Sequence, residues 1–353
     1  MLSFVFEPLP WRVIFGAGAL DRLPEELSRL EVAKALVLCT PEQRATAEDV
    51  ARRLGEKSVG IYDGAVMHVP LEVARAARAH AAALGADACV AVGGGSTIGL
   101  GKAIALEFGT PIIAVPTTYA GSEMTPIWGL TEAGVKRTGT DRRVLPRAVI
   151  YDPTLTLSLP PELSGVSGMN AIAHCVEALY AKNTNPVISL MAEDGIRALA
   201  KSLPCVVRAP DDLAARTQAQ YGAWLAGASL GAVGMAIHHK LCHTLGGTLN
   251  LPHAQTHTVV LPHAVAYNRQ AAPEAMARVA AALGVADAAS GLFDLAVAVG
   301  ARTSLRELGM RADDIERVAG LATANPYWNP RPLTREGVRA LLEDAFEGRR
   351  PVA

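Results

Sequence analysis

The sequence predicts an α/β domain followed by an all-helical domain. At 353 residues the chain is long enough for two domains of about 100 to 200 residues each. Its first half alternates short, continuously apolar runs with alanine-rich helical patterns, as in parallel sheets covered by helices on both faces. Beyond Tyr151 nearly every segment has helical periodicity instead. We therefore expect one domain over residues 1–157 and a second over residues 158–353.

The elements of the first domain follow from its apolar runs. Four runs are predicted strands: ALVLCT at 35–40, KSVGIYD at 57–63, ACVAVGGG at 88–95 and TPIIAVPTT at 110–118. An alanine-rich segment, VARAARAHAAALG, is predicted to be a helix. The segment AVIYDPTLTLSLPPEL ends the last predicted strand, and its three prolines mark the passage to the helical domain.

A glycine-rich turn joins one predicted strand to a helix. The strand ACVAV runs straight into Gly93, Gly94, Gly95 and Ser96, and a helical pattern continues to Phe108. Glycines let a ligand approach the backbone, and N–H groups at a helix start attract phosphate oxygens. The turn therefore favours a nucleotide, although it is neither G-x-G-x-x-G nor a Walker loop. A tight turn that binds no ligand is the alternative.

The end of the predicted strand TPIIAVPTT, with the residues that follow it to Glu123, supplies hydroxyl groups and small side chains. We expect it at the same edge of the sheet as the glycine-rich turn, where ligands bind in α/β proteins. Thr40 ends the first long strand, at a place where an acidic residue commonly holds a ribose hydroxyl and repels a 2′-phosphate. Without that acid, both NADH and NADPH stay admissible. The candidate cofactor-binding residues are Thr40, Gly93, Gly94, Gly95, Ser96, Thr97, Thr117, Thr118, Tyr119 and Ser122.

The second domain carries two polar pairs with helical spacing. His239 and His243 stand four apart in a segment that suits a helix, so their side chains are expected on one face. Asn170 and His174 have the same spacing on another predicted helix. A single buried histidine is more often a hydrogen-bonded core residue than a ligand. Two such pairs in apolar helices indicate a functional site, because each buried polar group needs a partner.

A third histidine is expected to join these pairs. His253 follows Pro252, after a predicted break at Gly246 and Gly247, so we expect it to return from the start of another element. The other histidines of this stretch are interpreted as structural or peripheral, namely His238, His257 and His263.

Composition excludes several classes of function. Half of the residues are hydrophobic, 19% are charged and the net charge is −1, so there is no electrostatic footprint for nucleic acid or an acidic membrane. The N-terminus lacks the pattern of a signal peptide, and no apolar run reaches the 18 or so residues of a membrane span. The five cysteines are scattered and contain no CxxC. We expect a cytoplasmic protein with reduced thiols.

Taken together, the motifs resemble the iron-containing (group III) alcohol dehydrogenase family, which shares its fold with glycerol dehydrogenase and dehydroquinate synthase. The resemblance rests on FGAGAL, GGGSTIGLGK, PTTYAGSE, GMNAIAHCVEALY, HHKLCHTLGGTLNLPH and NPRPLT, in this order along nearly the whole chain. It implies a dehydroquinate synthase-like fold, a dinucleotide-binding α/β domain with the pyrophosphate on Gly93 to Ser96, and a nicotinamide that faces the histidines from a cleft between the domains. It also implies a homodimer, for which the N-terminal LSFVF could pair across a two-fold axis.

The chain departs from the family in its metal site. Family members that hold a divalent metal use an aspartate and three histidines, and the resemblance places Asn170, His174, His239 and His253 at these positions. His243 matches a histidine beside the nicotinamide. A family aspartate is replaced by Gly99, and the PTT loop is one residue shorter and carries Tyr119. These departures resemble the maleylacetate reductase branch, which reduces a carbon–carbon double bond without a metal.

That resemblance implies an NADH- or NADPH-dependent reduction of maleylacetate to 3-oxoadipate in aromatic degradation, with chlorinated maleylacetates as further candidate substrates and no required metal. Asparagine offers a metal only a neutral carbonyl, so affinity should drop. Hydride addition to the conjugated alkene gives an enolate, which needs hydrogen bonds and a proton. We expect the proton from His243 or His253, with His174 and His239 polarising the substrate. Lys240 and Tyr327 are weaker candidates for carboxylate contacts, and Lys240 is more readily interpreted as a solvated lysine.

Two alternatives stay open at this point. One is a metal-dependent alcohol or polyol dehydrogenase of the same fold, in which Asn170 still serves as a ligand. The other is a non-catalytic protein that keeps the nucleotide turn and has lost activity.

Overall fold

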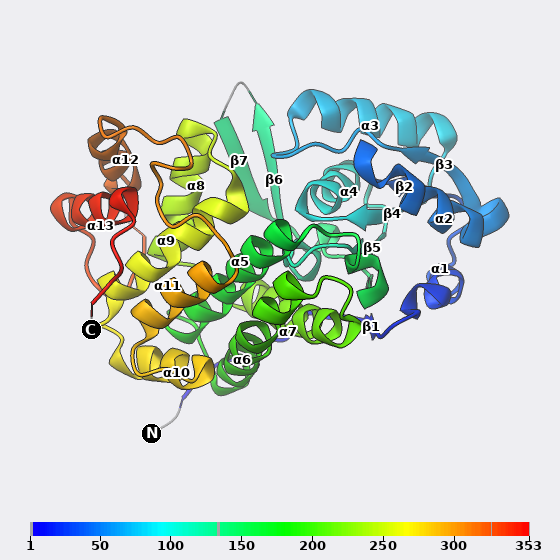
Figure 1. Cartoon of the computed structure of the whole chain (residues 1–353). Helices are drawn as coiled ribbons and strands as arrows, with labels where there is room; N and C mark the ends of the chain where they lie inside the picture. The colour runs from blue at the N-terminus through cyan, green and yellow to red at the C-terminus, as the bar shows by residue number, and fades with distance from the viewer. Residues whose placement is uncertain (1–2, 133–134, 326, 353) are drawn as a thin grey trace. The chain divides into compact units, whose positions relative to one another are not determined.

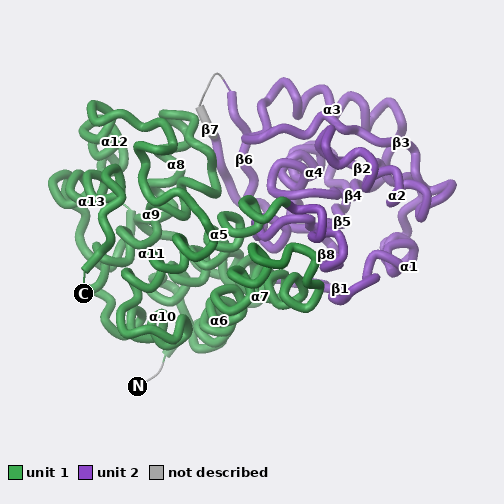
Figure 2. The backbone as a smooth tube through the Cα atoms, in the orientation of Figure 1, with its two compact units in different colours: residues 1–8, 160–353 green, residues 9–159 purple. Residues whose placement is uncertain are grey.

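A computed structural model describes residues 3–132, 135–325 and 327–352. The chain divides into two compact units, shown in Figure 2: an α/β unit, Leu9–Leu159, and a helical unit, Met1–Pro8 with Pro160–Ala353. The chain thus passes from one unit to the other two residues beyond the boundary expected from the sequence. The first residues of the chain group with the helical unit, which the sequence patterns did not predict.

Six parallel strands form the sheet of the α/β unit, in the order β1-β8-β5-β4-β2-β3 (Figure 1). They are β1 Val13–Phe15, β2 Ala35–Leu38, β3 Ser58–Tyr62, β4 Ala88–Gly93, β5 Ile112–Pro116 and β8 Ala148–Tyr151. All four apolar runs predicted to be strands are confirmed. The three-residue edge strand β1 was not predicted, because its half-buried residues form no long apolar run.

Helices cover both faces of this sheet. Along β2, Ala35 and Val37 pack on one face with α1 Leu23–Arg29 and α2 Arg44–Leu54. The alternate residues Leu36 and Leu38 pack on the other face with α3 Leu71–Leu84 and α4 Gly95–Phe108. Successive side chains of a strand point to opposite faces, so burial on both sides explains why these runs are continuously apolar. The predicted α/β class is confirmed.

A two-stranded antiparallel hairpin, β6 Ile127–Glu132 and β7 Val135–Thr140, lies outside the main sheet. The sequence analysis did not predict it. The described side chains of β6 are exposed or half-buried, so this strand lacks the continuous apolar run by which the other strands were recognised.

The second unit consists of helices, and its described residues contain no strand. The helices are α5 Pro161–Leu179, α6 Pro186–Arg208, α7 Leu213–Ala232, α8 Ile237–Leu249, α9 His253–Asn268, α10 Pro273–Leu283, α11 Ala288–Ala298, α12 Asp314–Thr323 and α13 Arg335–Glu347. Helix α5 packs against α6, α7 and α9, and its residues from Gly168 to Leu179 are all buried. A Cβ atom on Gly168 would lie 2.3 Å from Leu203 of α6, so this glycine allows the two helices to approach closely.

The segment Pro273–Ala298 reaches the length and mean hydropathy, 1.5, of a membrane span, although the sequence analysis expected no such run. It is half buried within the unit and is divided into α10 and α11 at Gly284, whose φ is +73°. Packing within a helical core accounts for its apolar character.

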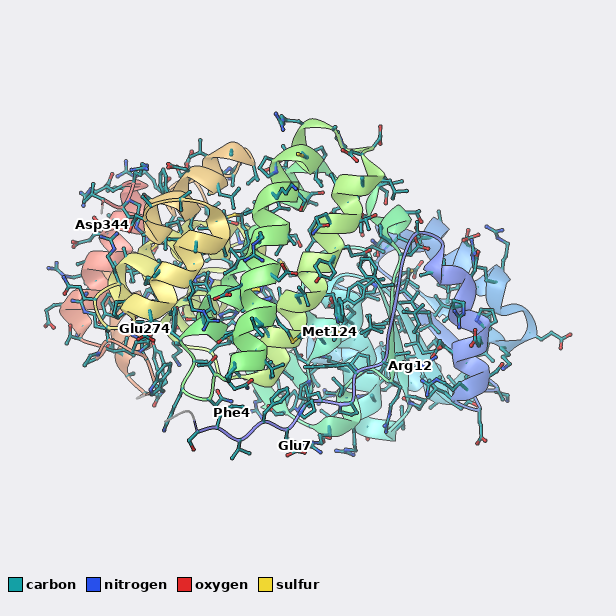
Figure 3. The ribbon with its side chains drawn as sticks, turned by 90° about the horizontal axis from the view of Figure 1, so that it is seen from below. Phe4, Glu7, Arg12, Met124, Glu274 and Asp344 are labelled. Carbon is teal, nitrogen blue, oxygen red and sulfur yellow. The ribbon has the colours of Figure 1, made fainter. Side chains whose placement is uncertain are left out.

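The N-terminal segment is extended, as Figure 3 shows along Phe4 and Glu7. Of the LSFVF segment, Leu2 lies outside the described residues, and residues 3–6 form no strand within the chain. Phe4 is 47% exposed and Val5 is 94% exposed. Pairing with a second chain therefore stays a prediction.

Candidate active site

Three helices of the helical unit bring their polar residues together. Helix α5 carries Asn170, His174 and Glu177, which are four and three residues apart and so share one face. Helix α8 carries four of the cluster's residues: His238, His239, Cys242 and His243. Helix α9 begins at His253 and carries His257 one turn later.

The imidazole rings form a continuous cluster. The rings of His174 and His239 stack with their centroids 5.2 Å apart, and His239 lies 6.2 Å from His243. His243 in turn lies 6.4 Å from His253, which is 4.3 Å from His257. The structure therefore brings together the histidines that the sequence singled out: both α8 histidines share a face, and His253 returns to them from the start of a helix.

The expected break at Gly246 and Gly247 was wrong. Helix α8 continues through both glycines to Leu249 and ends at Asn250, which has φ +53° and donates its N–H to the Gly246 carbonyl at 3.0 Å. Glycine destabilises a helix by only about 1 kcal/mol, whereas asparagine accepts the left-handed conformation that ends one.

Burial differs strongly along the cluster. Asn170, His174 and His239 are buried, and His238 and His257 are completely so. His253 is half-buried and His243 is exposed. Burial and the neighbouring imidazoles lower the pKa of His174, and likewise of His238 and His257, well below the usual value. These three rings are therefore neutral, and the exchange of a proton with solvent is easiest at His243 and His253.

Glu177 anchors the start of helix α8. Its carboxylate is fully buried and accepts the backbone N–H groups of Ala236 and His238 at 2.9 Å each and of His239 at 3.4 Å. The Tyr180 hydroxyl donates to the same carboxylate at 3.2 Å. The first N–H groups of a helix lack partners within it, and a negative charge there is favourable. Glu177 therefore acts as an N-terminal cap supplied by another helix.

The same carboxylate sets the orientation of His239. The Nδ1 atom of His239 lies 2.7 Å from Glu177 Oε2, so Nδ1 carries a proton and donates it to the carboxylate. The Nε2 atom of His239 is then the free position of the ring, and it has no hydrogen-bond partner among the described residues. Asn170 Oδ1 and His174 Nδ1 are likewise buried without a described partner. Glu177 was missed by the sequence analysis, although it stands three residues beyond His174, on the same helix face.

His238 and His257, interpreted from sequence as structural or peripheral, lie within the cluster and are buried. His238 Nε2 lies 2.9 Å from His257 Nδ1, and the Sγ of Cys242 lies 3.8 Å from the same His238 nitrogen. One proton between the two rings satisfies both nitrogens. These residues form the inner layer of the cluster, behind His239 and His253. The sequence signal for this placement was that His238 directly precedes His239 and that His257 stands four residues after His253.

The donor set does not fit a divalent metal well. The four positions that the family resemblance assigns to a metal present three imidazoles and the neutral amide of Asn170, without a carboxylate. Among the described residues, the set whose ligand atoms come within 4.8 Å of one another is His238, Cys242 and His257, rather than His174, His239 and His253. In this set, His238 Nε2 and His257 Nδ1 are 2.9 Å apart, a distance at which they share a proton. Two nitrogens that bind one tetrahedral ion lie about 3.3 Å apart. Burial also raises the pKa of the Cys242 thiol well above its usual value, which opposes metal binding.

In the α/β unit, three strand ends meet at one edge of the sheet. Strand β4 lies between β2 and β5, so Thr40, Gly93 and Thr117 end neighbouring parallel strands. The N–H of Thr117 donates to the Gly93 carbonyl at 3.2 Å, and the Gln43 amide donates to the Thr117 hydroxyl at 2.5 Å. Gln43 was not among the predicted residues.

The three glycines of this turn differ in what surrounds them. Gly93 has φ +152°, and a Cβ there would meet Thr97 Oγ1 at 2.5 Å. A Cβ on Gly94 would meet Thr118 Oγ1 at 2.9 Å, whereas one on Gly95 would meet only Ala120, at 3.8 Å. Gly93 and Gly94 are therefore required by packing within the protein. Gly95 is exposed at the start of α4, where backbone N–H groups are available to a ligand.

Not every predicted cofactor residue reaches the surface of this edge. Thr97 and Tyr119 are completely buried, so their side chains support the turn and the loop from inside. Thr118, Ser96 and Ser122 are half-buried. The loop that follows is also held from inside, because the buried Nζ of Lys102 donates to four oxygens of Ser122, Thr125 and Ile127 at 2.7–3.0 Å.

Two family models match the chain. One, described as iron-containing alcohol dehydrogenase, covers residues 10–153, and the other, the C-terminal part of the Fe-containing alcohol dehydrogenase family, covers residues 165–346. The chain belongs to the iron-containing alcohol dehydrogenase family. It is an oxidoreductase, and the resemblance drawn from its motifs is confirmed.

Similar proteins match over the full length. The maleylacetate reductase of Burkholderia cepacia is 60% identical over 351 residues, which are 99% of this chain and 100% of that protein. A structure described as a putative alcohol dehydrogenase from Ralstonia eutropha JMP134 is 62% identical with a TM-score of 0.99 and covers 100% of both chains. The maleylacetate reductase structure from Agrobacterium tumefaciens is 54% identical with a TM-score of 0.96 and covers 99% of this chain and 100% of that one.

Proposed function

We propose that this protein is an NADH- or NADPH-dependent maleylacetate reductase that converts maleylacetate to 3-oxoadipate without a required metal. One observation carries the proposal: in a chain 60% identical to a maleylacetate reductase over its length, Asn170 stands with three histidines at the positions that the family resemblance assigns to a metal, so the set contains no carboxylate. Three imidazoles and an amide suit hydrogen bonding to a substrate better than coordination of a divalent ion.

Reduction of the conjugated double bond requires hydrogen-bond donors for the enolate oxygen and a proton for the α carbon. The nicotinamide, when bound, supplies hydride to the alkene carbon β to the substrate's ketone, and the electron pair of the double bond moves to give an enolate. His174 and His239 polarise the ketone oxygen, where the negative charge gathers. Because Nδ1 of His239 already donates to Glu177, His239 does this in the form that carries a proton on both ring nitrogens. His243 or His253 then gives a proton to the α carbon, which completes the saturated product.

The assignment of the proton donor rests on access to solvent. A general acid must be protonated again after each turnover, and His243 and His253 are the more exposed members of the cluster. His238 and His257 are fully buried and neutral, so they serve to hold the other rings in place.

The cofactor is proposed to lie on the turn at Gly93 to Ser96, with Thr40, Thr97, Thr117, Thr118, Tyr119 and Ser122 forming its surroundings. Support comes from the meeting of three strand ends and from the open backbone at Gly95. We further propose a cytoplasmic homodimer. The exposed Phe4 and Val5 and the edge position of β1 support a contact with a second copy.

The direct test is the oxidation of NADH and of NADPH with maleylacetate, using protein treated with a strong chelator and checked for residual metal. Rapid turnover by the treated protein is expected. Replacement of His243 or His253 by Ala should lower kcat by about 10²- to 10⁴-fold for whichever residue is the acid, the usual contribution of general acid catalysis. If both variants turn over as fast as the unaltered enzyme, neither is the proton donor.

One observation favours a second candidate, a metal-dependent alcohol dehydrogenase. Asn170 Oδ1, His174 Nδ1 and His239 Nε2 are buried acceptors without a described partner, which an ion could satisfy. Activity that disappears on chelation and returns with zinc or iron, together with turnover of simple alcohols, would favour this candidate over the first.

A further inference from the structure

Lys240 is a cation without an acidic partner beside the histidine cluster. It follows His239 on α8 and stands three residues before His243, so Lys240 and His243 are neighbours on one face of the helix. Lys240 is half-buried, and among the described residues it forms no ion pair. Its ammonium group instead lies 5.6 Å from the centroid of the Tyr327 ring. A contact of this kind between an ammonium group and an aromatic face is attractive.

Tyr327 presents an unused hydroxyl at the same place. The atom is buried and has no hydrogen-bond partner among the described residues. Burial raises the pKa of Tyr327 strongly, and the negative charge of Glu177 adds to the rise. The hydroxyl therefore stays protonated as a donor.

The segment that carries Tyr327 is fixed to the start of α8. Asn329 Oδ1 accepts the N–H of Ile237 at 3.4 Å, and Asn329 exchanges two amide hydrogen bonds with Asn268 of α9, at 2.7 and 3.1 Å. Tyr327 also packs against the apolar core formed by α8, α9, α12 and α13. Lys240 thus lies on α8, and the segment that carries Tyr327 is hydrogen-bonded to α8 and α9.

We propose that Lys240 and Tyr327 bind one carboxylate of the substrate, which makes the site selective for dicarboxylic keto acids over neutral carbonyl compounds. The inference rests on the proposed function and names the groups that select its substrate class. An ammonium and a phenol supply two separate donors, which match the two oxygens of a carboxylate. A carboxylate bound there would also neutralise Lys240, whose charge has no counter-ion among the described residues.

The test compares Lys240→Met and Tyr327→Phe with the unaltered enzyme in steady-state kinetics with maleylacetate. The KM for maleylacetate should rise by about 10- to 100-fold in Lys240→Met, and less in Tyr327→Phe, since hydrogen bonds to a charged group are worth about 1.5–3 kcal/mol. The KM for NADH should change less than twofold, and Lys240→Arg should recover part of the loss. The matched control is Lys201→Met, an exposed lysine on α6, which should behave like the unaltered enzyme.

Binding of fumarate, a small dicarboxylate, separates this inference from the proposed function. Its dissociation constant, measured by calorimetry with NADH present, should rise at least 10-fold in Lys240→Met whatever the enzyme reduces. An enzyme that binds fumarate through Lys240 and does not reduce maleylacetate refutes the proposed function alone. An enzyme that reduces maleylacetate with the same KM and fumarate affinity in both variants refutes the carboxylate site alone. Thermal unfolding of each variant shows whether it is folded, and Tyr327→Phe carries the test if Lys240→Met is not.

Discussion

Replacement of Glu177 by Gln is the most direct test of how the site is held in shape. The carboxylate presents two oxygens to five donors. Oε1 accepts from the backbone N–H of His238 and from the Tyr180 hydroxyl, and Oε2 accepts from the backbone N–H groups of Ala236 and His239 and from Nδ1 of His239. An amide keeps one acceptor and turns the other end into a donor. The imidazole of His239 can change its tautomer and a hydroxyl can rotate, but a backbone N–H cannot.

The expected loss of stability follows from this geometry. At least one buried backbone N–H must face the new NH₂ group, and a lost hydrogen bond to a charged group destabilises by about 1.5–3 kcal/mol. Loss of the negative charge at the start of α8 adds about 0.3–1 kcal/mol. We expect a total of about 2–4 kcal/mol in the free energy of unfolding. The control Glu162→Gln lies on the same helix but is exposed, and it should change stability by less than about 0.5 kcal/mol.

The catalytic readout distinguishes positioning from mere stability. Helix α8 carries His239 and His243, so a shifted α8 should lower kcat/KM for maleylacetate by about 10- to 100-fold, since small misplacement of reacting groups has effects of this size. The affinity for NADH, measured by fluorescence, should not change, because the proposed cofactor turn belongs to the α/β unit. A folded Glu177→Gln enzyme with unchanged kcat/KM would show that the carboxylate only stabilises the helix. Unchanged stability as well would refute the reasoning altogether.

Two further predictions concern the cofactor turn and acid stability. Gly95→Ala should fold normally, because its Cβ would meet only Ala120 at 3.8 Å, but should weaken NADH binding at least 10-fold, as measured by fluorescence titration, if the pyrophosphate approaches the backbone there; unchanged affinity would place the phosphates elsewhere. Burial lowers the pKa of His263 to about 4, from 6.5 in the unfolded chain. Between these pH values the unfolded chain binds more protons, so stability falls as pH falls, by about 2 kcal/mol at pH 5 from this group. In urea unfolding, His263→Leu should lose about 2 kcal/mol less between pH 7.5 and pH 5 than the unaltered protein, and an equal loss would contradict the assignment.

The sequence patterns predicted the interior of the α/β unit because its strands are buried on both faces. Such strands leave a continuous apolar run, as in β2 and β4, and all four of these runs were found. Where burial is partial, as in β1 and β6, the signal disappears. The end of α8 was misplaced for a related reason: the sequence shows the glycines, but only the structure shows that Asn250 adopts the left-handed conformation.

The sequence predicted those parts of the site whose residues share one face of a single helix. Spacing of three or four residues on α5 and α8 gave the pairs, and the Pro-His sequence gave the start of α9. The contacts between helices could not be read from spacing. For this reason Glu177, 59 to 62 residues away from its partners on α8, was not recognised, and His238 and His257, 19 residues apart, were treated separately.

The arrangement of charge explains why such a cluster suits an anionic substrate. Among the described residues of the cluster the carboxylate is Glu177, which lies behind His239 and accepts hydrogen bonds from backbone N–H groups and from that ring. An aspartate at position 170 would instead place a negative charge among His174 and His239, where a metal ion could balance it. Without that ion it would repel both the carboxylates of a dicarboxylic keto acid and the enolate formed from it. Asn170 removes this charge and keeps the volume of the side chain. Under the proposed function, weaker metal binding and a preference for a dianionic substrate are thus two expected consequences of asparagine at position 170, since a carboxylate there would favour a metal ion and repel anions.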